Sequence, residues 1–162
     1  MAAPETFITG EYSRTLDERY RVALPSELYE ALCPDGAEVC ILAKEREGCL
    51  SLWHEQTWRE KVQAGIDLVR QKIVAHRLEG KLAKIQQWGR LLSTRFRDVR
   101  LGDRGRLVIP EGFREFLGVE PGGEVILVGA VICVELWHPE KWRTYLRRKM
   151  PRFGLLFEEL SQ

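Results

Sequence analysis

Arginines gather around two short turns that have the same spacing. Arg19 and Arg21 lie in the first turn, and Arg104 and Arg106 lie at the same places in the second, 85 residues later. A guanidinium group presents a planar fork of donors that matches phosphate oxygens and the edge of guanine. The two turns are therefore candidate contacts to nucleic acid.

Two further arginines precede these turns and extend the same basic segments. Arg14 comes before the first turn and Arg97 before the second. If the chain is extended here, Arg95 and Arg97 share one face and Arg100 lies on the other. A two-stranded ribbon of this kind fits the major groove of DNA. The alternative is a solvated strand face whose arginines pair with neighbouring carboxylates, namely Asp17, Glu18, Asp98 and Asp103.

An internal duplication positions the two turns. R-V-A-L-P at residues 21–25 matches R-L-V-I-P at 106–110, and each proline is followed by the pattern x-x-x-x-E-x-L. L-W-H followed by W-R occurs at 52–59 and again at 136–143, at an offset of 84. Such a period is too long for a solenoid, whose repeats run roughly 20 to 50 residues. The chain is therefore predicted to contain two copies of one small domain, with Glu38-Val39 matching Glu124-Val125.

Each copy is predicted to contain the same short elements. Strands over 7–16 and 94–101 lead into the turns, and a second short strand ends at Pro25 or Pro110. Proline suits the first turn of a helix, so a short helix should follow. Two more strands complete each copy. Because such small halves bury little surface alone, we expect them to pack as a pseudo-dimer.

A helical spacer separates the copies, and a basic helix with an apolar tail follows the second. Apolar residues of the spacer recur at three- and four-residue intervals, as on one face of a helix. Its basic side chains are expected to form a solvated face. The predicted organisation is a first repeat at 7–59, a spacer at 60–92, a second repeat at 93–148 and a tail at 149–162.

The charge of the chain is nearly balanced but unevenly distributed. Among 162 residues, 25 basic and 24 acidic groups give a net charge of +1, which excludes a polycation of the histone type. Residues 1–60 carry −6, residues 61–110 carry +8 and residues 111–162 carry −1. The neutral total therefore conceals a basic segment that leads into the second turn.

Several other classes of protein are not favoured. No run of apolar residues is long enough to span a bilayer, and Met1 to Glu5 lack the basic start of a signal peptide, so a cytoplasmic protein is expected. Four cysteines without a C-x-x-C pair indicate buried reduced thiols, with no metal site. His54 and His138 occupy matched positions beside tryptophans, where we expect structural roles. With no nucleotide-binding or hydrolase motif, we expect no enzyme, no cofactor and no small-molecule substrate.

The repeated motif also resembles a known family. L-[DG]-x-x-[YG]-R-x-x-[LI]-P, at 16–25 and 101–110, is similar to the motif of the MraZ family of bacterial transcriptional regulators, and the resemblance runs from about Phe7 to Arg148. It implies an α+β, β-rich fold of two AbrB-like swapped-hairpin halves that form a double-split β-barrel. It also implies ring-like homo-oligomers that bind direct repeats in promoter double-stranded DNA. The expected function is repression of the protein's own division and cell-wall gene cluster, in the cytoplasm at the nucleoid.

The resemblance also assigns roles to residues of the turns. It makes Arg21 and Arg106 the leading DNA contacts and Arg19 and Arg104 contacts of second rank. It gives Asp17 the role of orienting the first turn or its arginine.

This sequence departs from the family pattern at two positions. Gly102 stands where a second Asp is expected, with Asp103 one residue later as a substitute of different geometry. Tyr20 stands where Gly is usual, so a positive φ there would be strained and another turn conformation is expected.

An alternative function is protein binding. The AbrB-like fold also serves antitoxins whose tails bind a toxin. Here the basic helix and the apolar tail could dock a partner, or the tail could pack on its own subunit or a neighbour. The apolar residues concerned are Phe153, Leu155, Leu156 and Phe157.

Overall fold

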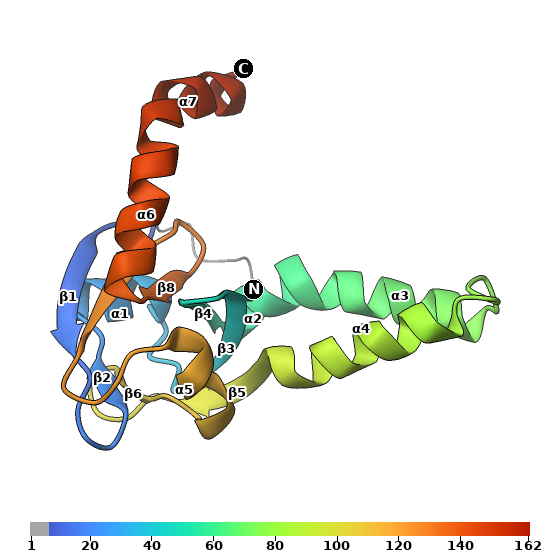
Figure 1. The fold of residues 1–162 in the computed structure, drawn as a ribbon, viewed down its shortest axis with the longest axis horizontal. Coiled ribbons are helices and arrows are strands. Elements are labelled where there is room, and N and C mark those ends of the chain that lie inside the picture. The colour runs from blue at the N-terminus through green and yellow to red at the C-terminus, as the bar shows by residue number, and fades with distance from the viewer. Residues whose placement is uncertain (1–6) are drawn as a thin grey trace.

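The protein is an α+β structure with a strand-rich body and two helical extensions (Figure 1). It is described by a computed structural model that covers residues 7–162. Residues 1–6 lie outside this range, and with them the segment on which the expectation of no signal peptide depends. Among the described residues, no helix is long and apolar enough to cross a membrane.

The body contains two sets of elements in the same order. The first set is β1 (Glu11–Thr15), β2 (Arg21–Ala23), α1 (Ser26–Leu32), β3 (Val39–Arg46) and β4 (Cys49–His54). The second set is β5 (Phe96–Arg100), β6 (Arg106–Val108), α5 (Glu111–Leu117), β7 (Glu124–Gly129) and β8 (Val134–Trp137). The helices predicted after Pro25 and Pro110 are confirmed, because each proline directly precedes a helix.

The strands form one open sheet and one separate ribbon. The sheet is antiparallel with the order β1-β7-β8-β4-β3-β5, and β2 pairs only with β6. The sheet order reads the same in reverse when each strand is exchanged for its counterpart, so a local twofold relates the two sets. Within residues 7–162, the strands thus leave an open sheet rather than a closed barrel.

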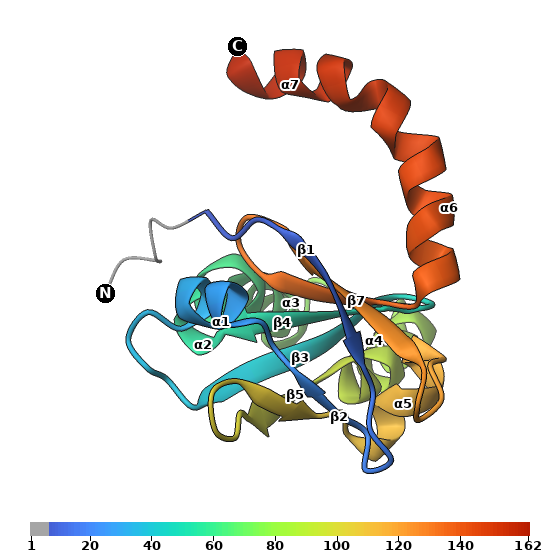
Figure 2. The same ribbon diagram turned by 90° about the vertical axis from the view of Figure 1, so that its left-hand side faces the viewer.

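Each set contributes its first strand to the other set. β1 pairs with β7, and β5 pairs with β3 (Figure 2). Val39 lies opposite Arg100, and Glu124 lies opposite Thr15, so Val39 and Glu124 are the equivalent residues. The match of Glu38-Val39 with Glu124-Val125 is therefore wrong by one residue. The extra residue of the first copy lies at the bulge in β3, where the register shifts between positions 44 and 46.

One apolar core joins both sets. Val22 of β2 and Leu107 of β6 are both buried, and they lie opposite each other in the ribbon. They belong to the same cluster as the buried leucines of α1, β3, β4, α5, β7 and β8. The ribbon is therefore held to the body by one face, and its other face is left to solvent.

Two helical extensions leave the body (Figures 1 and 2). The first begins with α2 (Glu55–Trp58) and a π-helical segment (Arg59–Gln63), then forms a long arm from α3 (Ala64–Val74) and α4 (Leu82–Arg95). The second consists of α6 (Pro139–Lys149), a 3-10 turn (Met150–Arg152) and α7 (Phe153–Ser161). No residue of α3, α4, α6 or α7 is buried.

The attachment of the ribbon can be tested at two adjacent residues. Leu107 is fully buried, whereas Val108 is 46% exposed. We expect Leu107→Ala to lower the free energy of unfolding by about 2–5 kcal/mol, because it leaves a cavity under the ribbon. Val108→Ala is the matched control and should change it by less than about 0.5 kcal/mol. Chemical denaturation measures both, and equal losses would contradict the inward orientation of Leu107.

Candidate nucleic-acid interface

The ribbon presents its two arginines on one exposed face. Its register pairs Arg21 with Val108, Val22 with Leu107, and Ala23 with Arg106. Because Val22 and Leu107 point into the core, Arg21 and Arg106 point away from it. They are diagonal neighbours on adjacent antiparallel strands, an arrangement in which the Cα atoms are typically about 7–8 Å apart.

The two turns are held in place by reciprocal hydrogen bonds between the repeats. Leu24 N–H donates to the Gly105 carbonyl at 3.1 Å, and Ile109 N–H donates to the Tyr20 carbonyl at 2.8 Å. Each turn is thus fixed by the strand of the other repeat.

Asp17 organises the first turn through both carboxylate oxygens. Oδ1 accepts from the backbone N–H groups of Arg19, at 2.8 Å, and Arg21, at 2.9 Å. Oδ2 accepts from Nε of Arg21 at 2.7 Å. These hydrogen bonds, led by that from the Arg21 backbone, lower the pKa of Asp17 below its ordinary value of 3.8. The charged carboxylate therefore orients the turn and the Arg21 side chain together.

The second turn keeps the closing backbone hydrogen bond but has no such carboxylate, and its Arg104 has a positive φ of 57° where the counterpart Arg19 does not. Gly102 N–H donates to the Arg106 carbonyl at 2.7 Å, as Asp17 N–H donates to the Arg21 carbonyl at 3.0 Å. Asp103, Arg104 and Arg106 are all exposed. Within residues 7–162, Asp103 makes no side-chain hydrogen bond or ion pair. The Arg106 side chain is accordingly not fixed by a carboxylate of its own turn.

Both turns have a positive φ at the same position, which is occupied by a tyrosine in the first turn and by a glycine in the second. Tyr20 has φ 59°, so the expectation of another conformation at this residue is wrong, and its equivalent Gly105 has φ 87°. The Tyr20 ring packs under the Arg114 guanidinium, with 4.1 Å from the guanidinium carbon to the ring centroid. The ring of Tyr29, the counterpart of Arg114, fills the space beside Gly105. Sequence reasoning did not single out Tyr29 and Arg114, although their shared offset of 85 was a usable signal.

Arg14 and Arg97 lie away from the ribbon. Arg14 is on β1 and Arg97 is on β5, which are the two opposite edges of the six-stranded sheet. Arg14 lies against the Tyr12 ring, with 5.8 Å to its centroid, and Arg97 is exposed. The structure therefore places two arginines, Arg14 and Arg97, on the edge strands of the sheet, and the other four at the ribbon and its turns, namely Arg19, Arg21, Arg104 and Arg106.

Two other arginines of the basic segment form ion pairs with the first repeat. Arg95 ends helix α4, so the prediction that it shares a strand face with Arg97 is wrong. Its guanidinium lies 3.9 Å from a Glu45 oxygen, and that of Arg100 lies 2.7 Å from a Glu38 oxygen. These two arginines are therefore paired with carboxylates of the first repeat where β5 lies beside β3.

The paired histidines cap helices. His54 Nδ1 accepts from Gln56 N–H at 3.0 Å, and His138 Nδ1 accepts from Glu140 N–H at 3.1 Å. His54 Nε2 also lies 3.0 Å from an Asp35 oxygen. Both rings thus satisfy backbone donors at the starts of α2 and α6.

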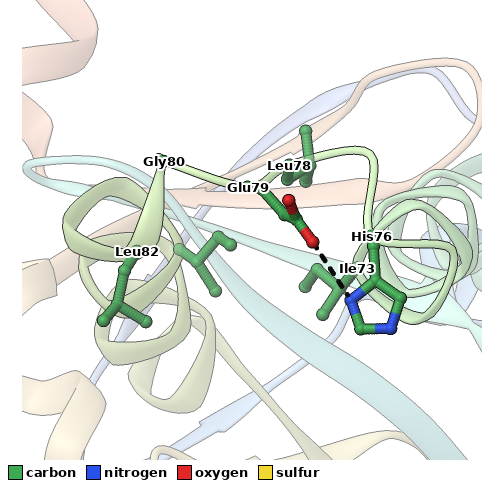
Figure 3. Close-up of a pocket in the computed structure, with 7 residues that line it drawn as sticks. Ile73, His76, Leu78, Glu79, Gly80 and Leu82 are labelled. Carbon is green, nitrogen blue, oxygen red and sulfur yellow. Dashed lines mark ion pairs between the residues drawn. The ribbon is translucent and has the colours of Figure 1, made fainter.

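A pocket of about 200 Å³ lies at the tip of the arm, far along the chain from the ribbon (Figure 3). Its walls are largely apolar, with Ile73 and Leu82 among them. His76 and Glu79 form its polar part, with 3.6 Å between Nδ1 and Oε1, and both are about four-fifths exposed. No nucleophile is paired with a base there. Elsewhere in the described chain, no group of three His, Cys, Asp or Glu residues is placed to hold a metal ion.

The fold and the site define a tandem-repeat protein that presents one arginine-bearing ribbon on its local twofold. Residues 92–154 match the family model described as "MraZ protein, putative antitoxin-like". Proteins named transcriptional regulator MraZ are similar over most of the chain. That of Heliobacterium modesticaldum is 25% identical over 93% of this chain and 94% of its own length. That of Roseiflexus castenholzii is 27% identical over 94% and 96%.

A third such protein, from Thermus thermophilus, is 28% identical over 82% of this chain and 83% of its own length. These matches extend across both repeats and the spacer. The chain is therefore similar to the MraZ family, through the family model in its second repeat and through these relatives over most of its length.

The role of Asp17 predicts a pH dependence. A carboxylate whose pKa is lower in the folded state than in the unfolded state stabilises the fold above the unfolded value, about 3.8, and loses this effect as the pH falls through the folded value. Asp17→Asn should therefore be less stable than the unaltered protein at neutral pH, and the difference should shrink below about pH 4. Thermal unfolding from pH 7 to pH 3 measures it. Asp103→Asn is the control and should show no such pH-dependent difference.

Proposed function

We propose that the protein is a transcriptional regulator that binds double-stranded DNA with the β2–β6 ribbon. The observation that carries this proposal is the placement of Arg21 and Arg106 on one exposed face of a two-stranded ribbon. The major groove, about 12 Å wide, admits such a ribbon and displays the guanine acceptors that arginine recognises. Arg19 and Arg104, in the adjoining turns, would contact the flanking phosphates.

The names of the relatives support a role in transcription rather than catalysis. We propose binding to direct repeats in the promoter of a division and cell-wall gene cluster, with repression as the outcome. The protein would act in the cytoplasm at the nucleoid, with neither cofactor nor small-molecule substrate. Arg14 and Arg97 would contribute only if DNA extends past the ribbon to the sheet edges.

We further propose that the strand exchange between the repeats is the swapped-hairpin arrangement of AbrB-like proteins. The observed pairing of β1 with β7 and β5 with β3 supports it. In this proposal, residues 7–59 and 93–148 are the repeats, 60–92 the spacer and 149–162 the tail.

Self-association would raise the affinity for repeated sites. One ribbon offers few phosphate contacts, and non-specific binding is then weak, with Kd on the order of 10⁻⁴ to 10⁻⁶ M. A ring-like homo-oligomer would engage several repeats at once and gain from effective concentration. The apolar side chains of α7 are available for such contacts, with Phe153 66%, Phe157 64% and Leu160 78% exposed.

Replacing the ribbon arginines tests the DNA interface. Arg21→Ala and Arg106→Ala should each weaken binding to the protein's own upstream DNA by about 1–3 kcal/mol, because each removes a contact to a base or a phosphate. The melting temperature should change little for Arg106→Ala, whose side chain is exposed, and somewhat more for Arg21→Ala, which also loses the hydrogen bond from Nε to Asp17. Mobility shifts and thermal unfolding measure the two effects.

Arg70→Ala, on the exposed arm, is the matched control and should bind like the unaltered protein. Binding should also weaken steeply with salt, with a slope of about −0.9 per phosphate contacted in a double-logarithmic plot. Unchanged binding by both ribbon variants, or a flat salt response, would contradict the proposal.

Capture of a partner protein by the tail is a second candidate function. The exposed apolar side chains of α7 and the antitoxin-like description of the family model favour it. In this case, α7 would bind a different protein rather than a copy of this chain.

Deletion of residues 150–162 separates the two candidates. If α7 joins copies of this chain, the deletion should lower the native mass of the free protein and weaken binding to repeated DNA sites, as avidity requires. Binding to a single site should be retained. Unchanged native mass, with unaltered DNA binding, would contradict the role of α7 in self-association and favour partner capture.

A further inference from the structure

Two buried thiols touch each other in the first repeat. Cys33 directly follows α1 and Cys40 lies in β3, and their sulfur atoms are 3.6 Å apart. The residues are 3% and 0% exposed, and both thiols are free. A disulfide bond measures about 2.0 Å, so its formation requires the two sulfurs to approach by roughly 1.5 Å.

The second repeat shows that the fold does not need sulfur at these positions. The counterpart of Cys33 is Gly118, and the strand register makes Val125 the counterpart of Cys40. Val125 is fully buried, so an apolar side chain of similar size satisfies the packing. Gly118 ends α5 with φ 79° and has no side chain at all. The pair of thiols is therefore a feature of the first repeat alone.

A compact turn keeps the two cysteines together. Gly36 N–H donates to the Cys33 carbonyl at 3.0 Å, and Asp35 Oδ1 accepts from Ala37 N–H at 3.2 Å. Asp35 Oδ2 lies 3.0 Å from Nε2 of the buried His54, which ties the turn to the end of β4. The distance between the sulfurs is thus fixed by the loop and by the helix and strand on either side of it.

The two thiols are not equivalent. A hydrogen bond from Cys40 lowers the pKa of Cys33, whereas the same hydrogen bond and burial raise the pKa of Cys40. Cys33 is also the less enclosed of the two, 3% against 0% exposed, so it is the thiol that an oxidant reaches first.

We propose that Cys33 and Cys40 form a reversible oxidation site that closes to an intramolecular disulfide when hydrogen peroxide reaches it. The Cys33 thiolate attacks one peroxide oxygen, the O–O bond breaks, and the released hydroxide takes up a proton to leave as water. Cys33 then carries a sulfenic acid. The Cys40 sulfur displaces its hydroxyl, the S–S bond forms, and a second water leaves with the Cys40 proton. The two sulfurs lose two electrons, which reduce one peroxide to two waters.

The disulfide would act on the second turn of the ribbon. Cys33 N–H donates to the Tyr29 carbonyl at 2.8 Å, so a shift of Cys33 toward β3 moves the end of α1. The Tyr29 ring fills the space beside Gly105, where an added Cβ would lie 3.1 Å from its Cγ and Cδ1 atoms. Displacing this ring removes the support of the turn that carries Arg104. Oxidation would thereby loosen one of the two DNA-binding turns, and this last step rests on the proposed function.

The oxidation itself is tested on the full chain without DNA. The protein is treated with hydrogen peroxide or with dithiothreitol, alkylated and weighed, and the linked residues are identified by peptide mapping. We expect the alkylatable thiols to fall from four to two, with Cys33 linked to Cys40 and full reversal by dithiothreitol. Cys40→Val places the residue of the second repeat at this position. Its three remaining thiols should all stay alkylatable after peroxide treatment and reduction, and Cys33 should form no disulfide. The double variant Cys49→Ala with Cys133→Ala should still form the link between Cys33 and Cys40. If the unaltered protein does not form this disulfide, the proposal is overturned.

Hydrogen exchange then tests the coupling to the ribbon. In the oxidised protein, residues 102–106 should exchange about tenfold faster, the change that roughly 1.4 kcal/mol of local destabilisation produces. Residues 17–20 serve as the internal control and should be unchanged. If the disulfide forms but the exchange rates of residues 102–106 do not change, the proposed coupling between the disulfide and the second turn is overturned. Absence of DNA binding in both redox states would instead refute the proposed function and leave the oxidation result standing.

Discussion

The pairing of β2 with β6 is the constraint on which the exposed surface depends. Each strand has only three residues, too few to persist alone, and each finds its partner in the other repeat. Val22 and Leu107 anchor the pair to the common core, and the reciprocal bonds from Leu24 and Ile109 fix the turns. The arginine-bearing surface therefore exists only when both repeats are folded together.

Within this symmetric frame, the two turns are stabilised by different chemistry. The first uses the Asp17 carboxylate to hold its arginine and accepts a strained Tyr20 whose ring packs on Arg114. The second has no such carboxylate, has a positive φ at both Arg104 and Gly105, and has the Tyr29 ring packed beside Gly105. The duplication thus kept the hydrogen bonds between the repeats but not the full turn backbone, and only Arg21 is bonded to a carboxylate of its own turn.

The sequence predicted what depends on local patterns and missed what depends on pairing between distant strands. The turns, the helices after the prolines and the matched positions of the ribbon arginines follow from a repeat that is visible over short stretches. The equivalence of Val39 with Glu124 is not visible in the sequence. The recurring Glu-Val pair suggests an alignment shifted by one residue, which the strand pairing does not support. Arg95 was assigned to a strand because an alternating pattern does not reveal where a preceding helix ends. The support of Gly105 by Tyr29 depends on contacts across the twofold, which no local pattern contains.

The distribution of charge acquires a meaning once the strands are paired. The acidic first repeat and the basic segment meet because β5 lies on β3, and there Glu38 and Glu45 pair with Arg100 and Arg95. Two of the basic side chains are thus paired with carboxylates of the first repeat. Within residues 7–162, Arg104 and Arg106 have no acidic group within ion-pair distance. If the proposed DNA binds at this end of the ribbon, no internal ion pair of Arg104 or Arg106 has to break first, whereas binding at Arg95 or Arg100 on the sheet would compete with Glu45 or Glu38.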